Sequence, residues 1–434
     1  MKKIKLNRFG RRFWRTVSTL FGLLVIFNIY YFSTLTGYDE DRLFPITTAV
    51  KHSAYQNAIA KAEEHLSAIG ANTDFPSFSV AVGHQGRLVW TAAAGYQDLA
   101  TQKAATPQTQ YRIGSTSKAV TATGVARAMD QKLLDIDAMI GDTITNWSPK
   151  KWDLNMRQLL SHTAGIGNYP DFGLHSAKYT MTNYYPFETA AEGIKVFDRY
   201  DLIFAPGTSF AYSTFGTNLA SVVLEQATST PFLEYLEREV FTPLDMQNTY
   251  GDHDKPKTEH FATFYETDNG YYREFRSLGL LYDINLSYKW AGGGIISTPT
   301  DLVKMGMSYL KDDHFLSADT KRTLWTPQKL VSGELNEQHY ALGWRSYLAY
   351  KNDLLLDGET PLWMVHHGGV SKGSQNFLVL FPNYDLVIDV SINTNIDNFG
   401  SLGKQLYTIA NYFLIEIEKE EIPLYRNIKT ATEQ

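Results

Sequence analysis

Strand-like segments lie near both ends of this 434-residue chain, and a long, mainly helical stretch separates them. Runs of β-branched and aromatic residues bounded by turn residues predict strands at 78–82, 87–93, 340–349, 362–367, 377–381 and 386–392. Apolar residues at helical spacing predict helices at 51–69, 119–129, 156–160, 217–226, 231–240 and 400–418, and Pro299 starts another. The order β, long α insert, β, α predicts one α+β unit of two subdomains.

Two turns are expected from glycine. His84-Gln85-Gly86 is typical of a hairpin turn, in which we expect the histidine to be solvated. Gly292-Gly293-Gly294 is expected to be a flexible turn, and no lysine follows it to support phosphate binding.

The N-terminus combines a basic segment with an apolar one. Seven lysines and arginines and no acid occur in the first fifteen residues, and no charged residue occurs from Thr16 to Leu35. About 20 such residues can span a bilayer as a helix, and the basic flank should stay cytoplasmic. We therefore expect a cytoplasmic tail (1–15), a transmembrane anchor (16–36), a linker (37–50) and a folded domain outside the cytoplasm (51–430), periplasmic if the cell is bacterial. A cleaved signal peptide and a buried core helix are the alternatives.

Charge and cysteine content narrow the classes of partner. The formal net charge is -6, which leaves -13 for the remainder once the +7 of the first fifteen residues is removed. An acidic globular part argues against nucleic acid as a partner. Because the chain has no cysteine, disulfides, thiol nucleophiles and thiolate metal sites are excluded.

The pattern Ser-x-x-Lys pairs a nucleophile with a candidate base one helical turn away, and it occurs four times, at Ser115, Ser148, Ser308 and Ser401. Only Ser115 lies at a turn-to-helix junction between the first hairpin and the helical stretch. Such a junction offers backbone N–H donors to a developing oxyanion. Context therefore selects Ser115.

The segment Tyr111-Arg112-Ile113-Gly114-Ser115-Thr116-Ser117-Lys118 resembles the active-site motif of serine β-lactamase-related hydrolases and penicillin-binding proteins. Further segments occur in the order typical of that family: 159–165, 206–213, 292–298, 340–344 and 366–369. The resemblance covers about 51–412 and is strongest to the class C branch, which includes D-aminopeptidases, esterases and mitochondrial serine β-lactamase-like proteins; 212–216 is similar to the last group. It implies a mixed antiparallel sheet flanked by terminal helices (51–114 and 337–420) and a mainly helical subdomain (119–336).

The resemblance implies roles for three residues. Ser115 would form an acyl-enzyme, Lys118 would act as base if neutral, and Tyr212 would pass a proton to the leaving group. The structural alternatives are a helix-capping serine, a solvated lysine and a buried aromatic side chain. A strict Tyr-x-Asn also occurs at Tyr350-Lys351-Asn352, in what we expect to be a solvated turn between strands.

Two positions depart from the usual family pattern. Thr214 occupies a position where many relatives have asparagine, and its hydroxyl offers fewer contacts to a substrate amide. His366-His367-Gly368 aligns with Lys-Thr-Gly of lactamases and with His-x-Gly of esterases and peptidases. Adjacent strand residues face opposite sides, so only one histidine should face the cleft. The alignment assigns this to His366 and gives the backbone N–H of Gly369 to the oxyanion hole.

The sequence thus predicts a membrane-anchored serine hydrolase that cleaves an ester, amide or peptide bond without metal or other cofactor, with efficient β-lactam hydrolysis less expected. Its partners would be a small-molecule or peptide substrate and the membrane. His162 follows a serine but is expected to shape a turn. A catalytically weak or inactive scaffold or cell-wall-binding protein is the alternative, and filament formation is suggested only by similarity to the mitochondrial group.

Overall fold

A computed structural model describes residues 8–33, 35–37, 44–72, 75–142, 144, 147–148, 150–169, 183, 185–268, 271–275, 283–311 and 313–419. Residues 1–7 of the predicted basic tail, residues 38–43 of the predicted linker and the C-terminal residues from 420 on lie outside this set. The main sheet is antiparallel, with strand order β11-β12-β13-β14-β3-β4-β2, and β5 pairs with β4. Its strands are β2 (Ile46–Lys51), β3 (Ser77–His84), β4 (Arg87–Asp98), β5 (Lys103–Ala104), β11 (Arg345–Tyr350), β12 (Leu362–Ser371), β13 (Ser374–Phe381) and β14 (Leu386–Ile392).

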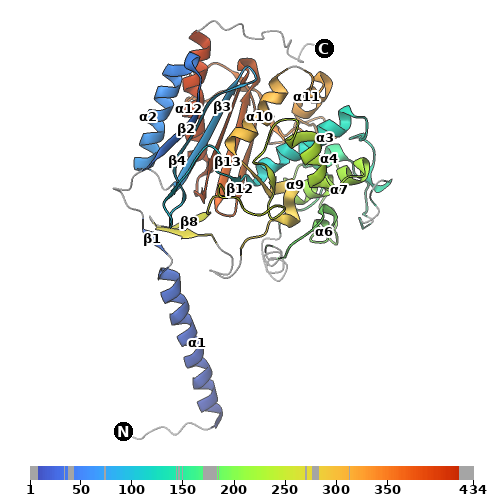
Figure 1. The fold of residues 1–434 in the computed structure, drawn as a ribbon. Helices are drawn as coiled ribbons and strands as arrows, with labels where there is room; N and C mark the ends of the chain where they lie inside the picture. Colours follow the sequence, from blue (N-terminus) through green and yellow to red (C-terminus); the bar gives the residue numbers. More distant parts are fainter. Residues whose placement is uncertain are drawn as a thin grey trace.

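Helices cover both faces of this sheet (Figure 1). Helices α2 (Gln56–Asn72) and α12 (Phe399–Lys419) pack on one face, and the helical subdomain lies beyond the other. The latter comprises α3 (Ser117–Asp130), α4 (Met156–Leu160), α6 (Ala190–Ile194), α7 (Thr214–Thr228), α8 (Phe232–Leu236) with a π-helical turn (Glu237–Phe241), α9 (Trp290–Gly293), α10 (Pro299–Leu310) and α11 (Ala318–Trp325). Short 3-10 turns lie at Ser53–Tyr55, Gly114–Thr116, Ile140–Asp142, Ser287–Lys289 and Pro382–Tyr384.

Each central strand contributes to two hydrophobic cores. Along β13, Leu378 and Leu380 pack toward the helical subdomain, whereas Phe377 and Val379 pack toward α2 and α12. A sheet buried on both faces needs apolar residues at successive positions, because adjacent side chains point to opposite faces. This explains the nearly continuous apolar character of the predicted strands.

Two small sheets lie outside the main one. Strands β6 (Tyr111–Arg112), β10 (Ile295–Ser297) and β7 (Tyr250–Gly251) pair antiparallel just before the Ser115 turn. Strands β1 (Thr36–Gly37), β9 (Tyr271–Glu274), β8 (Tyr265–Asp268) and β15 (Thr394–Asn395) form the second. The part of the chain predicted as a helical insert therefore also supplies short strands.

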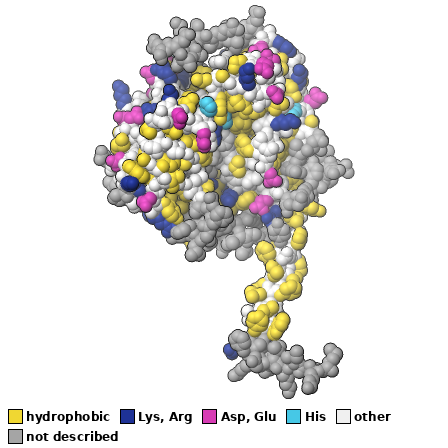
Figure 2. All heavy atoms as spheres, turned by 180° about the vertical axis from the view of Figure 1, so that it is seen from behind, with side chains coloured by type: hydrophobic (Ala, Val, Ile, Leu, Met, Phe, Trp, Pro, Cys, Tyr) yellow, Lys and Arg dark blue, Asp and Glu magenta, His cyan; other side chains and the backbone are white. Residues whose placement is uncertain are grey.

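Helix α1 (Arg8–Ser33) projects away from the domain (Figure 1). Apolar side chains cover most of the face of this helix that Figure 2 shows. Its segment Arg12–Tyr30 is 19 residues long, apolar enough to cross a membrane, and unburied by the rest of the protein. A core helix would be buried, so that alternative is wrong. Length and composition fit a membrane anchor or a signal sequence.

Four local predictions are wrong, each because of a tertiary contact. The predicted linker contains β2, which pairs with β4. The strand expected from 340 starts at Arg345, because the Asn336 side chain binds both the N–H and the C=O of Tyr340 (2.8 and 2.7 Å). His84 is buried and hydrogen-bonded to the Tyr55 hydroxyl, and burial lowers its pKa to about 4. The triple glycine belongs largely to the buried helix α9.

Candidate active site

Ser115 lies on a tight turn that connects β6 to α3. Gly114 has φ +53°, and a Cβ added there would lie 2.7 Å from the backbone of Val370, so the turn requires glycine. Ser115 is partly exposed, whereas Gly114 and Thr116 on either side of it are buried. The serine hydroxyl is therefore accessible on a rigid support.

Lys118 is the nearest basic group to the serine. Its Nζ lies 3.2 Å from Ser115 Oγ, 3.3 Å from Thr214 Oγ1 and 2.5 Å from the carbonyl oxygen of Gly292. Burial lowers the pKa of Lys118 well below its usual value, and the nearby cations Lys289 and Arg345 lower it further. A neutral amine can donate to the carbonyl and to Thr214 and accept from the Ser115 hydroxyl. The geometry therefore suits a general base.

Tyr212 contacts both members of the Ser115–Lys118 pair. Its ring centroid is 4.8 Å from Lys118 Nζ, and its hydroxyl is hydrogen-bonded to Ser115. Burial raises the pKa of Tyr212 to about 12, although the hydrogen bond to Ser115 acts in the opposite direction. The phenol is therefore protonated at neutral pH, so the lysine amine is the better base and the phenol the better proton donor.

Two buried histidines, His162 and His367, contact the aromatic side chains next to the Ser115–Lys118 pair. His162 packs its ring 4.3 Å from that of Tyr212 and 4.4 Å from that of Tyr340, and its Nδ1 accepts from the backbone N–H of Ser213 (3.3 Å). His367 Nε2 is 2.8 Å from the Tyr340 hydroxyl. Its Nδ1 is 2.8 Å from the carbonyl oxygen of Gly368, so Nδ1 carries the proton and the Tyr340 hydroxyl donates to Nε2. Burial keeps the pKa of both histidines well below 6.5.

The prediction that His366 faces the cleft is wrong. His366 points to the α12 face, where it stacks on Tyr347 (5.6 Å) and meets Phe377 edge-on (5.4 Å). His367, on the opposite face, belongs to the same polar cluster as Lys118; burial lowers its pKa, and the nearby Arg345 and Lys118 lower it further. The family motif therefore corresponds to residues one position further along β12 than predicted. A shift of one residue exchanges the two faces of a strand.

The glycines of β12 permit the close approach of this strand to the Ser115 turn. A Cβ on Gly369 would lie 1.9 Å from the carbonyl oxygen of Ile113 and 2.9 Å from the backbone nitrogen of Ser115. A Cβ on Gly368 would instead meet Phe399 of α12 at 2.7 Å. Gly369 is therefore needed for packing directly against the nucleophile turn.

The strand register also bears on which N–H faces the serine. Ser371 pairs with Ser374 across a two-residue turn, and the residues that flank such a turn exchange backbone hydrogen bonds. Hydrogen-bonded and non-hydrogen-bonded pairs alternate along antiparallel strands, so the odd-numbered residues of β12 bond to β13. The backbone N–H and C=O groups of the even-numbered residues point away from β13, to the other edge of β12. Val370 is even-numbered, and its backbone touches the Gly114 position. The register thus favours the N–H of Val370 over the predicted N–H of Gly369 as the second oxyanion donor.

Thr214 is buried at the start of α7, where its Oγ1 is hydrogen-bonded to Lys118 Nζ. The backbone N–H of Thr214 donates to Asn168 Oδ1 (3.2 Å). Its hydroxyl therefore contacts Lys118, and a role in substrate binding remains a prediction. The exposed carboxamide of Asn168 lies beside it, contributed by a different loop. Sequence spacing gave no signal for this neighbour.

Two cations near the base were missed by sequence reasoning. Lys289 is only 8% exposed, and its ammonium lies 5.7 Å from the ring centroid of Tyr169. Arg345 lies over the rings of Tyr212 and Tyr340 (5.6 and 5.2 Å) and donates to Gln338 Oε1 (2.6 Å). No carboxylate among the described residues is within ion-pair distance of either cation. No local motif marks either residue, because only folding brings them to Lys118.

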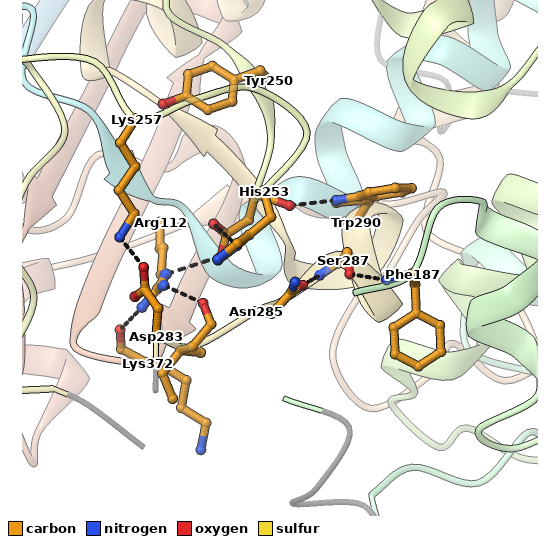
Figure 3. A network of polar contacts seen from close by, with 12 residues as sticks. Arg112, Phe187, Tyr250, His253, Lys257, Asp283, Asn285, Ser287, Trp290 and Lys372 are labelled. Atoms are coloured by element: carbon orange, nitrogen blue, oxygen red, sulfur yellow. Dashed lines mark hydrogen bonds and ion pairs between the residues drawn. The ribbon is translucent and has the colours of Figure 1, made fainter. Parts of the chain in front are cut away.

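A buried polar network supports the turn from the side of β6 (Figure 3). Arg112 Nε pairs with Asp252 Oδ2 at 3.2 Å, and its other nitrogens donate to the carbonyl oxygens of Ile284 (2.9 Å) and Lys372 (3.2 Å). Trp290 Nε1 donates to the carbonyl oxygen of Asp252 (2.9 Å). The network thus ties the strand preceding Ser115 to the β12–β13 turn and to α9.

The alternative candidates have other surroundings. Ser148 binds Asp198, Ser308 binds the carbonyl oxygen of Met305 within α10, and Ser401 is exposed on α12. Tyr350 and Asn352 are hydrogen-bonded to each other (3.2 Å) on the α12 side of the sheet. Within the described part of the chain, no group of three or more His, Asp or Glu residues could hold a metal ion.

The fold and the Ser-Lys-Tyr arrangement are typical of the β-lactamase and penicillin-binding-protein-like class of proteins. The sequence model described as Beta-lactamase matches residues 60–407, so the chain belongs to the beta-lactamase family of serine hydrolases. This confirms the predicted family and fold class.

Similar proteins come from distant sources. The mitochondrial serine beta-lactamase-like protein LACTB of Homo sapiens is 25% identical over 410 residues, covering 76% of this chain and 73% of its own. Protein flp of Staphylococcus aureus (strain MW2) is 23% identical over 345 residues, covering 78% of this chain and 64% of its own. The solved structure of EstCE1, a hydrolase with promiscuous acyltransferase activity, has a TM-score of 0.69 at 18% identity and covers 82% of this chain and 99% of its own.

Proposed function

We propose that the chain is a membrane-anchored serine hydrolase that cleaves an ester, amide or peptide bond through an acyl-enzyme on Ser115. The observation that carries this proposal is the position of Lys118 Nζ, which lies 3.2 Å from Ser115 Oγ. Its surroundings favour the neutral amine, and two other acceptors orient it. A buried lysine held against a serine in this way suits nucleophile activation.

In acylation, Lys118 accepts the Ser115 proton while Oγ bonds to the substrate carbonyl carbon. The carbonyl oxygen becomes an oxyanion, and the backbone N–H groups of Ser115 and Val370 are the donors that the strand register favours. When the tetrahedral intermediate collapses, the bond to the leaving group breaks. The proton taken up by Lys118 passes through the Tyr212 hydroxyl to the departing oxygen or nitrogen.

Deacylation reverses these roles. A water molecule gives a proton to the Tyr212–Lys118 pair and attacks the acyl carbon, and the Ser115 oxygen recovers the proton when the acid product leaves. No group other than those of the chain and water is required. The expectation of a reaction without cofactor rests on this balance.

His367 favours an ester or peptide substrate over β-lactams. A lysine at this position would be a permanent cation beside the nucleophile, whereas the buried His367 is neutral. A neutral imidazole holds a hydrogen bond with Tyr340 and offers no charge to a β-lactam carboxylate. Efficient antibiotic hydrolysis is therefore the less expected activity.

Helix α1 supports the membrane part of the proposal, since its apolar segment is exposed on all sides. With the basic tail in the cytoplasm, the domain lies across the membrane. Protease digestion of intact cells tests this orientation. We expect the domain to be digested while the cytoplasmic membrane is still intact, and a domain protected until that membrane is opened would contradict the orientation.

The catalytic proposal is tested with a fluorophosphonate probe and labelled penicillin on the full-length chain, followed by mass spectrometry of the labelled peptide. We expect covalent label on Ser115 that is lost in Ser115→Ala. Ser401→Ala, at another Ser-x-x-Lys, is the matched control and should label like wild type. Equal labelling of Ser115→Ala and wild type would refute the assignment. Absence of any label would favour a scaffold protein.

A further inference from the structure

Tyr212, the proposed proton relay, lies in a segment that forms neither helix nor strand (208–213), just before α7. Because no regular ladder of hydrogen bonds fixes this segment, the position of the phenol depends on the contacts that its neighbours make. Both residues that flank Tyr212 are bonded to the turn that follows α4. The residue of that turn that makes these contacts is His162.

His162 holds the chain on both sides of Tyr212. Its backbone carbonyl oxygen accepts the N–H of Ala211 (2.9 Å), and its ring Nδ1 accepts the N–H of Ser213 (3.3 Å). The imidazole also packs against the ring of Tyr212 itself, with the two ring centroids 4.3 Å apart. A single residue thus fixes both neighbours of the phenol and its ring.

Two features of His162 are unfavourable in themselves. Its backbone has φ +61°, in the left-handed region that residues other than glycine seldom adopt. Burial keeps its pKa low, so the ring is neutral and carries its proton on Nε2, because Nδ1 is an acceptor. This Nε2–H is buried without a hydrogen-bond partner in the described part of the chain. Such strain and such unpaired groups gather at functional sites, where the surrounding structure maintains them.

His162 also links Tyr212 to the strand beside the nucleophile. Its ring lies 4.4 Å from that of Tyr340, whose hydroxyl is bonded to His367 of β12. The same strand carries Val370, which the register favours as an oxyanion donor. The contacts of His162 therefore connect the proton relay to the strand that approaches the Ser115 turn.

We propose that His162 is the positioning residue of Tyr212, and that its Nδ1 holds the segment before α7 so that the phenol hydroxyl meets Ser115. The inference rests on the proposed hydrolase function and adds the residue that sets the geometry of proton transfer. His162 touches no reacting atom in this scheme, and no proton passes through it. A displacement of about 1 Å in a reacting group can cost on the order of 100-fold in rate, so the loss of this contact is measurable.

The test separates the ring of His162 from its hydrogen-bond acceptor. His162→Phe keeps an aromatic ring but removes the acceptor at Nδ1. His162→Asn removes the ring, but its side-chain oxygen is attached at the same point as Nδ1, and asparagine tolerates a left-handed backbone. His52→Phe is the matched control, because Nδ1 of the exposed His52 accepts the backbone N–H of Ala54 (3.3 Å) just before α2.

The readout is the kcat/KM for phenyl butanoate divided by that for 4-nitrophenyl butanoate, measured on the full-length chain. Both esters give the same acyl-enzyme, so the ratio reports acylation, in which phenolate needs the proton from Tyr212 more than 4-nitrophenolate does. We expect His162→Phe to lower the ratio by roughly 10- to 100-fold. His162→Asn should keep it within roughly fivefold of wild type, because its oxygen accepts the same N–H. His52→Phe should leave it unchanged.

A double-mutant cycle distinguishes positioning from a general loss of structure. Tyr212→Phe removes the phenol hydroxyl, so adding His162→Phe to it should change the ratio no further. An unchanged ratio in His162→Phe alone would overturn the inference while leaving the Ser115 chemistry intact. An equal fall with and without the Tyr212 hydroxyl would overturn it as well, because His162 would then act independently of the phenol.

Hydrogen exchange followed by mass spectrometry keeps the inference testable if no ester is hydrolysed or a variant does not fold. The amide of Ser213 should be protected in the wild type and in His162→Asn, and it should exchange roughly tenfold or more faster in His162→Phe. A wild-type Ser213 amide that exchanges as in an unstructured peptide would overturn the inference without any variant. Protection of this amide by His162 with no turnover of either ester would instead count against the proposed catalysis alone.

Discussion

Replacing Lys118 by methionine gives the sharpest test of the proposed chemistry. Methionine fills a similar volume but has no lone pair that can accept the Ser115 proton. The carbonyl oxygen of Gly292 and the hydroxyl of Thr214 also lose their contacts with Nζ. We expect acylation to slow strongly while Ser115 remains in place on its turn.

The structure sets the size of this effect. The nearest other candidate base is Tyr212, whose pKa of about 12 leaves only ~10⁻⁵ of the phenol ionised at pH 7. Tyr212 is therefore a poor substitute for the amine. Loss of a positioned general base costs about 10² to 10⁴ in rate, and we expect about 10³ or more here, or roughly 4 kcal/mol in the barrier.

The assay is the second-order rate constant for fluorophosphonate labelling of Ser115 in the full-length chain, measured at several pH values. Lys311→Met is the matched control, because Lys311 follows Ser308 with the same spacing but is exposed. Thermal unfolding checks that both variants are folded. A folded Lys118→Met protein labelled within about tenfold of the wild-type rate would show that Lys118 is not the base.

Three further outcomes follow from the site. The amine of Lys118 is active when deprotonated, so activity falls as the pH drops through the pKa of Lys118. Lys289→Met removes a cation that lowers this pKa, so it should move the acidic limb of the kcat/KM profile to higher pH. An unmoved limb would contradict the coupling between Lys289 and Lys118. Tyr212→Phe keeps the ring but removes the proton relay, so kcat for poor leaving groups such as amides should fall by about 10²-fold or more and by less for 4-nitrophenyl esters, as measured by paired substrates. Gly369→Ala places a methyl group 1.9 Å from the carbonyl oxygen of Ile113, so labelling should fall at least 100-fold and the melting temperature should drop; normal labelling would argue against the close approach of β12.

Much of the fold was predictable because its elements carry strong local patterns. The helix at Met156–Leu160 and the strand at Leu386–Ile392 have the predicted bounds, and α10 begins at Pro299 as expected, with Thr298 as its N-cap. These signals depend on neighbours within a few residues. Predictions failed at Tyr340 and His84, whose conformation and burial depend on Asn336 and Tyr55, respectively.

The candidate site was likewise predictable only where local spacing places its residues. Ser115 and Lys118 were identifiable because one helical turn fixes their separation, and the order of motifs then indicated Tyr212. The choice between His366 and His367 failed because strand facing depends on register to a single residue. The two histidines look equivalent in sequence, and only their contacts with Tyr347 and Tyr340 distinguish them.

The sequence by itself determined the main β, α, β, α order, the apolar N-terminal segment and the Ser115–Lys118 pair, because each is encoded by short-range spacing and composition. Tertiary structure decided which histidine lies beside Lys118 and which cations lower the pKa of Lys118. It also placed Arg345 over the rings of Tyr212 and Tyr340. Burial and charge at a site depend on residues distant in the chain, and those are brought together only when the sheet and the helical subdomain pack.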